Sequence, residues 1–292
     1  MRQLLLSVLC VVPALVVADE SAQSSRLSEL LNEDNDAGFE RANTEREFSF
    51  PQDHGPHEKF RNEWWYITGN LDDDDGRRFG FELTIFRFAL TPDVQRTASK
   101  WRANQVYIAH LAVADVERNR FHVAERFSRG ALGLAGARVE PFRVWIDHWE
   151  IASDGPNQPW RVTAADDEIA LDLTLTPLKT PVLNGDAGLS RKSSSTDSAS
   201  YYYSITRLQT DGTVSVAGED YTVSGLSWLD REWSTSALAA DQVGWDWFAL
   251  QLSDGTDLML YNIRNADGTA DPNSSGTLTF SDGRSRVLRQ GD

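Results

Sequence analysis

The feature that most constrains the fold is a series of short runs in which apolar and other residues alternate, separated by turns rich in Gly, Asp or Asn. Residues 64–71 and 79–88 flank an acidic turn and predict a β-hairpin. Further strands are expected at 106–115, 121–127, 142–151, 160–164, 169–176, 201–209, 214–223, 245–252, 258–264, 276–280 and 286–289. Regular short strands with such turns favour an antiparallel barrel or sandwich over βαβ units. We therefore predict an all-β protein.

Two irregularities are expected within this pattern. The alternation changes parity at Ile85 and Phe86, which predicts a β-bulge. Residues 186–200, rich in serine, are expected to form a mobile loop or lid between strands.

The N-terminus indicates export. Residues 1–18 combine a basic start, an apolar stretch and a small residue at the end, which is typical of a secretory signal peptide cleaved near Ala18. The apolar stretch is shorter than the ~20 residues of a membrane span, and an uncleaved anchor is the alternative. We therefore expect a periplasmic or secreted protein. Cys10 is the one cysteine, so the mature chain would lack disulfides and thiolate sites. The polar, acidic residues 19–47 are expected to be a flexible leader.

Charge and motifs exclude several function classes. The formal net charge of −16 makes nucleic acid an unfavourable partner. No nucleophile elbow, phosphate-cradling glycine loop or redox cysteine pair occurs, which disfavours hydrolase, kinase and oxidoreductase activities. We expect no cofactor.

Three blocks interleave tryptophan with acidic residues, at 53–71, 228–233 and 244–252. In composition and order they resemble the lipocalin-like family that contains the AttH proteins and the acyclic-carotenoid 1,2-hydratases (CrtC-like), from about residue 50 to the C-terminus. The resemblance implies two consecutive lipocalin-like antiparallel β-barrels, the first over 48–227 and the second from 228. Only about four strand-like runs follow Trp228, whereas a barrel typically needs about eight. We therefore expect the second barrel, 228–292, to be incomplete, with the last strands the least stable part.

The resemblance also implies a function. The preferred interpretation is a periplasmic AttH-like protein that binds a hydrophobic lipid or isoprenoid and has a link to an envelope ABC-type export system. The alternative is a carotenoid 1,2-hydratase, a hydro-lyase that adds water to a terminal C=C bond. In hydratases a histidine is expected where this chain, like the AttH-like branch, has Arg231. A guanidinium at that position disfavours a second proton-bearing acid beside it.

Hydration of an alkene requires a protonated acid and electron-rich aromatic walls. Asp230 is the predicted catalytic acid, because burial would raise its pKa, and Trp233 is the second predicted catalytic residue. The aromatic walls would come from Trp228, Trp233, Trp245 and Trp247. The structural alternative is that Asp230 and Glu232 form ion pairs with Arg231 in a turn between two sheets.

The predicted ligand-binding residues are polar or aromatic side chains in or near the three blocks: His54, His57, Glu63, Trp64, Trp65, Tyr66, Arg87, His110, Arg231, Trp245, Asp246 and Trp247. His-x-x-His on an irregular loop lacks the helical geometry of a metalloprotease, so we assign no metal site. Arg87 is expected to pair with Glu63 or Glu82 and to hold a polar ligand head. His110 and His148 share parity with apolar neighbours, so both are expected to face the interior, as satisfied core residues or as ligand contacts.

Overall fold

The computed structural model describes residues 36–92, 99–155, 158–194, 198–236, 238–239 and 241–292. The predicted signal peptide and residues 19–35 of the predicted leader lie outside these ranges. Among the described residues, strands dominate and the one helical element is a 3-10 turn, η1 (Gln52–His54). No helix in the described ranges is long and apolar enough to cross a membrane.

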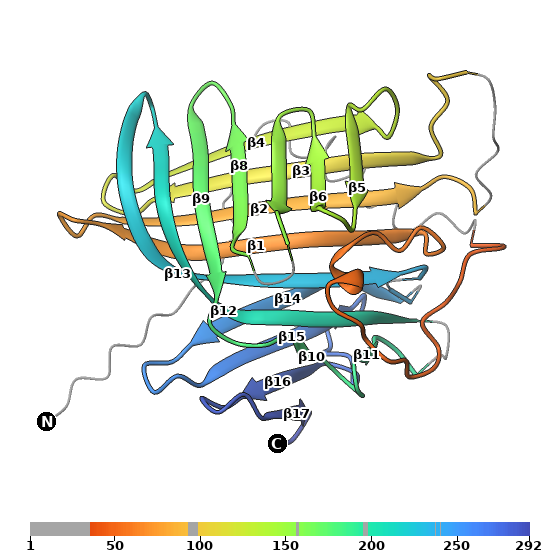
Figure 1. The fold of residues 1–292 in the computed structure, drawn as a ribbon. Coiled ribbons are helices and arrows are strands. Elements are labelled where there is room, and N and C mark those ends of the chain that lie inside the picture. Colours follow the sequence, from red (N-terminus) through yellow and green to blue (C-terminus); the bar gives the residue numbers. More distant parts are fainter. Residues whose placement is uncertain (1–35, 93–98, 156–157, 195–197, 237, 240) are drawn as a thin grey trace, which may run out of the picture.

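A large antiparallel sheet of 13 strands has the order β4-β3-β2-β1-β13-β12-β9-β8-β7-β6-β5, with β10 and β11 paired to β12. The strands are β1 (Asn62–Asp73), β2 (Arg78–Ala89), β3 (Gln105–Asp115), β4 (Arg120–Arg129), β5 (Ala135–Arg138), β6 (Phe142–Ile146), β7 (Trp149–Ser153), β8 (Trp160–Ala165), β9 (Ile169–Pro177), β10 (Val182–Leu183), β11 (Leu189–Arg191), β12 (Ala199–Val216) and β13 (Glu219–Ser234). The sheet curls until β5–β9 cross in front of β2–β4, and this gives a nearly closed barrel around the apolar core (Figure 1).

A second, smaller sheet has the order β14-β15-β16-β17, with β14 (Gln242–Gln251), β15 (Asp257–Asn265), β16 (Ser275–Thr279) and β17 (Ser285–Arg289). It packs on the outer face of the large sheet. There Tyr202 of β12 and Trp228 of β13 bury against Met259, Tyr261 and Ile263 of β15. All-β architecture with lipocalin-like barrel geometry is therefore confirmed, and the second sheet is the smaller of the two.

A buried charge cluster ties the small sheet to the large one. Asp257 of β15 is fully buried and accepts hydrogen bonds from Lys179 Nζ at 2.6 Å and from Arg207 Nη2 at 2.6 Å. Thr206 Oγ1 donates a third at 2.8 Å. Since both cations belong to the large-sheet part of the chain, Asp257 fixes the position of β15 on β12.

We expect Asp257→Asn to loosen the small sheet selectively, because it leaves two largely buried cations without their carboxylate. Hydrogen exchange should become faster by at least tenfold in β15 and β16 and stay unchanged in β2. Unfolding of the whole chain as one unit, with exchange rising equally in β2, would contradict this and would also overturn the expectation that the last four strands are the least stable part.

Several sequence expectations need correction. Residues 142–151 and 214–223 were each expected to be one strand, but each contains a tight turn between two strands. Asp147 (φ 53°) makes the first turn, and Ala217 (φ 53°) with Gly218 (φ 82°) makes the second, as two-residue hairpins require. The expectation of a bulge at Ile85 is wrong, because β2 pairs with β1 without interruption. The irregularity lies in β12, between Ile205 and Leu208.

The boundaries also differ. Residues 36–47 of the expected flexible leader lie against the barrel, with Phe39 and Ala42 buried. The large sheet continues to Ser234, so the boundary expected at residue 227 falls inside β13. The segment expected to be a lid at 186–200 contains β11, which pairs with β12.

Candidate functional site

Alternate residues of β13 face opposite sides of the large sheet. Arg231 and Trp233 face the barrel interior, whereas Trp228, Asp230 and Glu232 face the small sheet. Consequently the two predicted catalytic residues, Asp230 and Trp233, lie on opposite faces of one strand. The other predicted site residues divide in the same way.

The interior group centres on Glu63, which is fully buried and forms ion pairs with both Arg87 and Arg231. Both guanidiniums are themselves fully buried. Burial alone would raise the pKa of Glu63, but these two cations, with a hydrogen bond from His57, hold it well below its usual value. The pairing of Arg87 with Glu63 confirms one of its two expected partners.

Two histidines extend this network. His57 Nε2 lies 2.9 Å from Asp53 Oδ1, and its ring stacks on Trp233 with centroids 3.7 Å apart. His54 Nδ1 lies 2.6 Å from the Tyr203 hydroxyl. Burial, followed by the charge of Arg231, lowers the pKa of His54 to about 4, so this imidazole is neutral at physiological pH.

Trp65 and Arg231 complete the buried network of the barrel interior. Trp65 Nε1 donates to the His54 carbonyl at 2.8 Å, and the Arg231 guanidinium lies 3.9 Å from the centroid of the Trp65 ring. These contacts join six residues into one connected network: His54, His57, Glu63, Trp65, Arg87 and Arg231. The alternative that Arg231 pairs with Asp230 and Glu232 in a turn is wrong, because Arg231 points into the barrel and pairs with Glu63.

The second group lies between the two sheets. We call it the inter-sheet seam, and it comprises Tyr66, Lys192, Ser200, Tyr202, Ser204, Trp228, Asp230, Glu232 and Trp247. Asp230, only 4% exposed, accepts hydrogen bonds from Ser204 Oγ at 2.5 Å, Trp228 Nε1 at 2.7 Å and the Tyr202 hydroxyl at 2.8 Å. Burial raises its pKa to about 7, although the three donors oppose the shift. Asp230 is therefore a carboxyl that is partly protonated at neutral pH.

Glu232, two residues along the same face, has a different environment. It lies 3.1 Å from Lys192 Nζ and accepts a short hydrogen bond from Ser200 Oγ. Burial by itself would lower the pKa of Lys192, but Glu232 and its neighbours raise it, so the ammonium stays charged. One carboxyl of the seam thus lies beside a cation, whereas the other is surrounded by neutral donors.

Half-buried aromatic side chains border the seam. The Tyr66 ring contacts Trp247 edge-on with centroids 5.3 Å apart, and Trp247 meets Trp228 at 6.3 Å. Trp64 and Phe86 lie 6.2 Å apart on the same outer face, and both are half-buried. Trp245 of β14 is 41% exposed. Asp246 points away from Trp247 and lies 3.7 Å from Arg264.

The two histidines expected in the interior are elsewhere. His110 lies on the outer face of β3, 3.3 Å from Glu125, because the buried residues that share its parity, Val106 and Ile108, belong to a separate outer cluster. His148 lies exposed in the turn after β6 and contacts the Ala165 carbonyl at 2.9 Å. Sequence analysis missed Tyr202, Ser204 and Lys192, which reach Asp230 and Glu232 only through the pairing of β12 with β13 and the position of β11.

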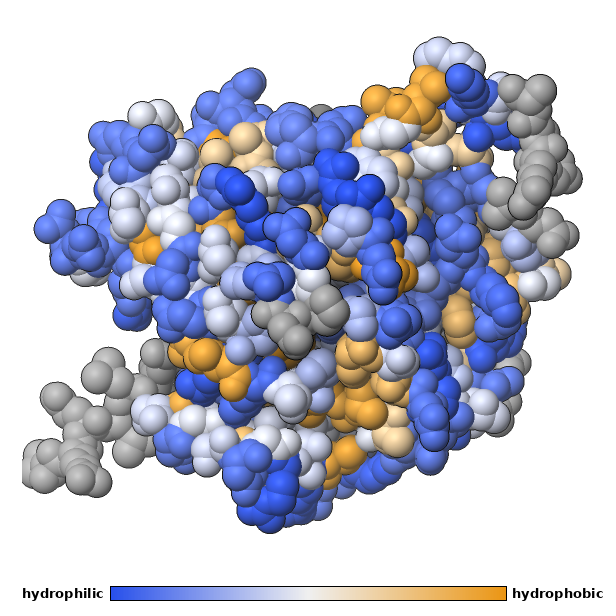
Figure 2. Space-filling model, viewed as in Figure 1, coloured by the Kyte–Doolittle hydropathy of each residue, from blue (hydrophilic) through white to orange (hydrophobic). Residues whose placement is uncertain are grey.

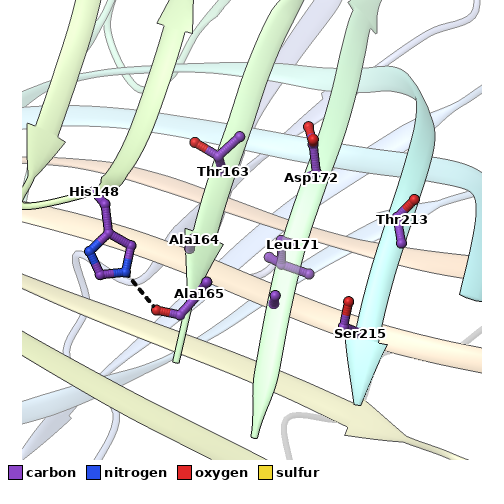
Figure 3. A pocket seen from close by; sticks show the side chains of 9 residues that line it. His148, Thr163, Ala164, Ala165, Leu171, Asp172, Thr213 and Ser215 are labelled. Atoms are coloured by element: carbon purple, nitrogen blue, oxygen red, sulfur yellow. Dashed lines mark hydrogen bonds between the residues drawn. The ribbon is translucent and has the colours of Figure 1, made fainter. Parts of the chain in front are cut away.

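A surface hollow of about 260 Å³ lies away from both groups (Figure 3). Short side chains of β8, β9 and β12 line it, and Thr213 and Ser215 stand at the opposite end of β12 from Ser204. The hollow contains no residue of the seam, and His148 at its rim is engaged with the Ala165 carbonyl. These observations therefore do not support the hollow as the functional site.

The chain is similar to several known proteins. A family model described as AttH-like matches residues 41–292. The crystal structure of a putative AttH from Nitrosomonas europaea aligns with a TM-score of 0.77 at 34% identity, over 86% of this chain and 75% of that chain. Kievitone hydratase from Nectria haematococca aligns with a TM-score of 0.60 at 15% identity, over 86% of this chain and 73% of that chain, which is a likeness of fold. No curated protein gives a significant match.

Proposed function

The chain belongs to the AttH-like family, and from this premise we propose that it binds a hydrophobic lipid or isoprenoid at the inter-sheet seam. The observation that carries the proposal is the pairing of an aromatic border, Tyr66 and Trp247, with the hydrogen-bonded carboxyl of Asp230 beneath it. Sites for small apolar ligands combine mostly aromatic and aliphatic walls with a few placed polar groups.

The barrel interior is a less favourable place for a ligand than the inter-sheet seam. Its largest fully buried side chains include three tryptophans and the ion-paired arginines Arg87 and Arg231. Insertion of a ligand there would require separation of Glu63 from two guanidiniums, at a cost of several kcal/mol. On the outer face, Figure 2 shows apolar side chains gathered in the lower part of the view, where Figure 1 places β10, β11 and the small sheet.

A second function is favoured by one property of Asp230. Because burial raises its pKa to about 7, a fraction of this carboxyl carries a proton at neutral pH. That proton would go to one alkene carbon, water would add to the resulting carbocation, and the proton that the bound water then releases would return to the carboxylate. Trp228 and Trp247 would shield the resulting carbocation. This is the chemistry of a carotenoid 1,2-hydratase acting on a terminal C=C bond. The basic residue beside Asp230, Arg231, points to the opposite face and therefore does not enter this chemistry.

The cellular setting completes the proposal. We propose that the protein acts in the periplasm and passes its ligand to or from an envelope ABC-type exporter. The signal-peptide pattern at residues 1–18 supports the periplasmic location, and the export system that the family resemblance implies supports the partner.

The binding proposal predicts that Trp247→Leu weakens the binding of an uncharged apolar fluorophore, N-phenyl-1-naphthylamine, by roughly tenfold, because an aromatic wall of the seam is lost. Trp145→Leu is the matched control, since Trp145 is also half-buried on the outer side of the large sheet but lies on β6, outside the seam. Fluorescence titration measures both. Equal affinities of the two variants, or no binding by the wild type, would contradict the proposal.

Native mass spectrometry after incubation with a lipid extract containing acyclic isoprenoids separates the two functions. A binding protein retains its ligand unchanged. A hydratase gives a product heavier by one water, and Asp230→Asn must abolish that product.

A further inference from the structure

The strand registers align six outer-face residues in one row across the large sheet. Ser204 of β12 lies opposite Asp230 of β13, and Asp230 lies opposite Tyr66 of β1. Tyr66 lies opposite Thr84 of β2, which in turn lies opposite His110 of β3, and His110 lies opposite Glu125 of β4. Adjacent strands are about 4.8 Å apart, so His110 lies about 14 Å from Asp230 along this row.

The far end of the row is polar. His110 Nε2 lies 3.3 Å from Glu125 Oε2, and both side chains are about one-third exposed. Glu82, one step along β2, is half-buried and accepts a hydrogen bond from Thr84 Oγ1 at 2.6 Å. Burial raises the pKa of Glu82, opposed by that hydrogen bond and by the charge of His110. Two carboxyls and one imidazole thus lie together at this end of the row, and the carboxyl oxygens offer hydrogen-bond acceptors.

An apolar row runs beside the polar one. This row lies two residues along each strand from the polar row. It contains side chains that pair across neighbouring strands: Trp64 of β1, Phe86 of β2, Ile108 of β3 and Phe127 of β4. The His110 ring contacts Phe86 edge-on, with centroids 5.6 Å apart, and Phe127 is 56% exposed. A polar group at each end of an aromatic surface matches an elongated apolar molecule better than a compact one.

We propose that the outer face of β13-β1-β2-β3-β4 holds one elongated apolar ligand across the strands, with one polar end at Asp230 and a second, hydroxyl-bearing end at His110 and Glu125. This inference rests on the proposed binding function and specifies the ligand class. A terminal hydroxyl donates a hydrogen bond to Glu125, whereas a terminal carboxylate has no hydrogen to donate to Glu125 or Glu82 and is disfavoured.

The test is titration calorimetry with three probes of equal chain length: a linear primary alcohol, the corresponding α,ω-diol and the corresponding ω-hydroxy acid, over a series of lengths. We expect the diol to bind about three- to tenfold more tightly than the alcohol when its ends are about 14 Å apart, the gain of one hydrogen bond. The hydroxy acid should bind more weakly than the diol.

Glu125→Leu should remove the advantage of the diol, so that the diol binds no more tightly than the alcohol. Glu168→Leu is the matched control, because it too removes a carboxyl that pairs with a histidine. Glu168 lies 3.0 Å from His122 of β4, which is on the opposite face of β4 from Glu125. Alcohol and diol binding equally to the wild type, with both affinities unaffected by Glu125→Leu, would overturn the second polar end. No binding of any probe would instead overturn the proposed function itself.

Discussion

Glu63→Gln should destabilise the protein by about 3 to 5 kcal/mol, because it leaves the buried guanidiniums of Arg87 and Arg231 facing each other without a countercharge. The loss is expected to be a stability effect and to lower ligand binding only through unfolding. Urea unfolding followed by tryptophan fluorescence measures it, since three of the largest buried side chains are tryptophans of the barrel core.

The matched control is Asp172→Asn, which removes the carboxylate of an exposed ion pair with Arg161 at 2.9 Å. A pair exposed to this degree contributes at most about 1 kcal/mol. A Glu63→Gln variant no less stable than the Asp172→Asn variant would show that the interior network is not needed to close the barrel.

The second large effect is a pH-dependent stability difference between wild type and Asp230→Asn. The pKa of Asp230 rises from 3.8 to about 7 on folding, because the carboxyl is buried. Below pH about 4 it is protonated in both the folded and the unfolded state. As pH increases from about 4 to about 7 the unfolded chain releases this proton and the folded chain retains it, so wild-type stability falls. Above pH 7 the loss is complete and amounts to roughly 4 kcal/mol.

Asparagine carries no titrating proton. The stability of the variant relative to that of the wild type should therefore rise by roughly 4 kcal/mol between pH 4 and pH 8. Urea unfolding of both proteins at each pH gives the difference directly, because ionisable groups away from Asp230 are common to both proteins and cancel to first order. A difference that stays constant across this range would mean that Asp230 is ionised in the folded protein. The proton-donor function would then be excluded.

Sequence reasoning placed most strands correctly, because alternation of apolar residues follows directly from burial of one face. It failed where two strands meet in a two-residue turn, as at Asp147 and Ala217, because neither turn contains the Asn-Gly or Asp-Gly signal. Phe86 and Phe88 also misled it. Both faces of β2 are apolar, so the continuation of an apolar run looked like a change of parity.

The candidate site was predictable in part. Tryptophan and carboxylate in residues 228–233 singled out this segment, and the chemistry of alkene hydration singled out Asp230 as the candidate acid. The division into two groups was not predictable without the pairing of β13 with β1 and β12, because only the register shows that Asp230 faces Ser204 and that Arg231 faces Trp65 and Tyr203. Lys192 lies far from Glu232 in the sequence, and their contact depends on tertiary packing.

The alternation along β13 has a consequence for redesign. Residues that anchor the barrel and residues that would contact a ligand are adjacent in sequence yet separated by the thickness of the backbone. The two functions can therefore vary independently as long as the register is kept. The half-buried Tyr66, which borders the seam, is open to laboratory evolution of new ligand preferences, whereas a single insertion or deletion in β13 would exchange the two sets of side chains and lose both at once.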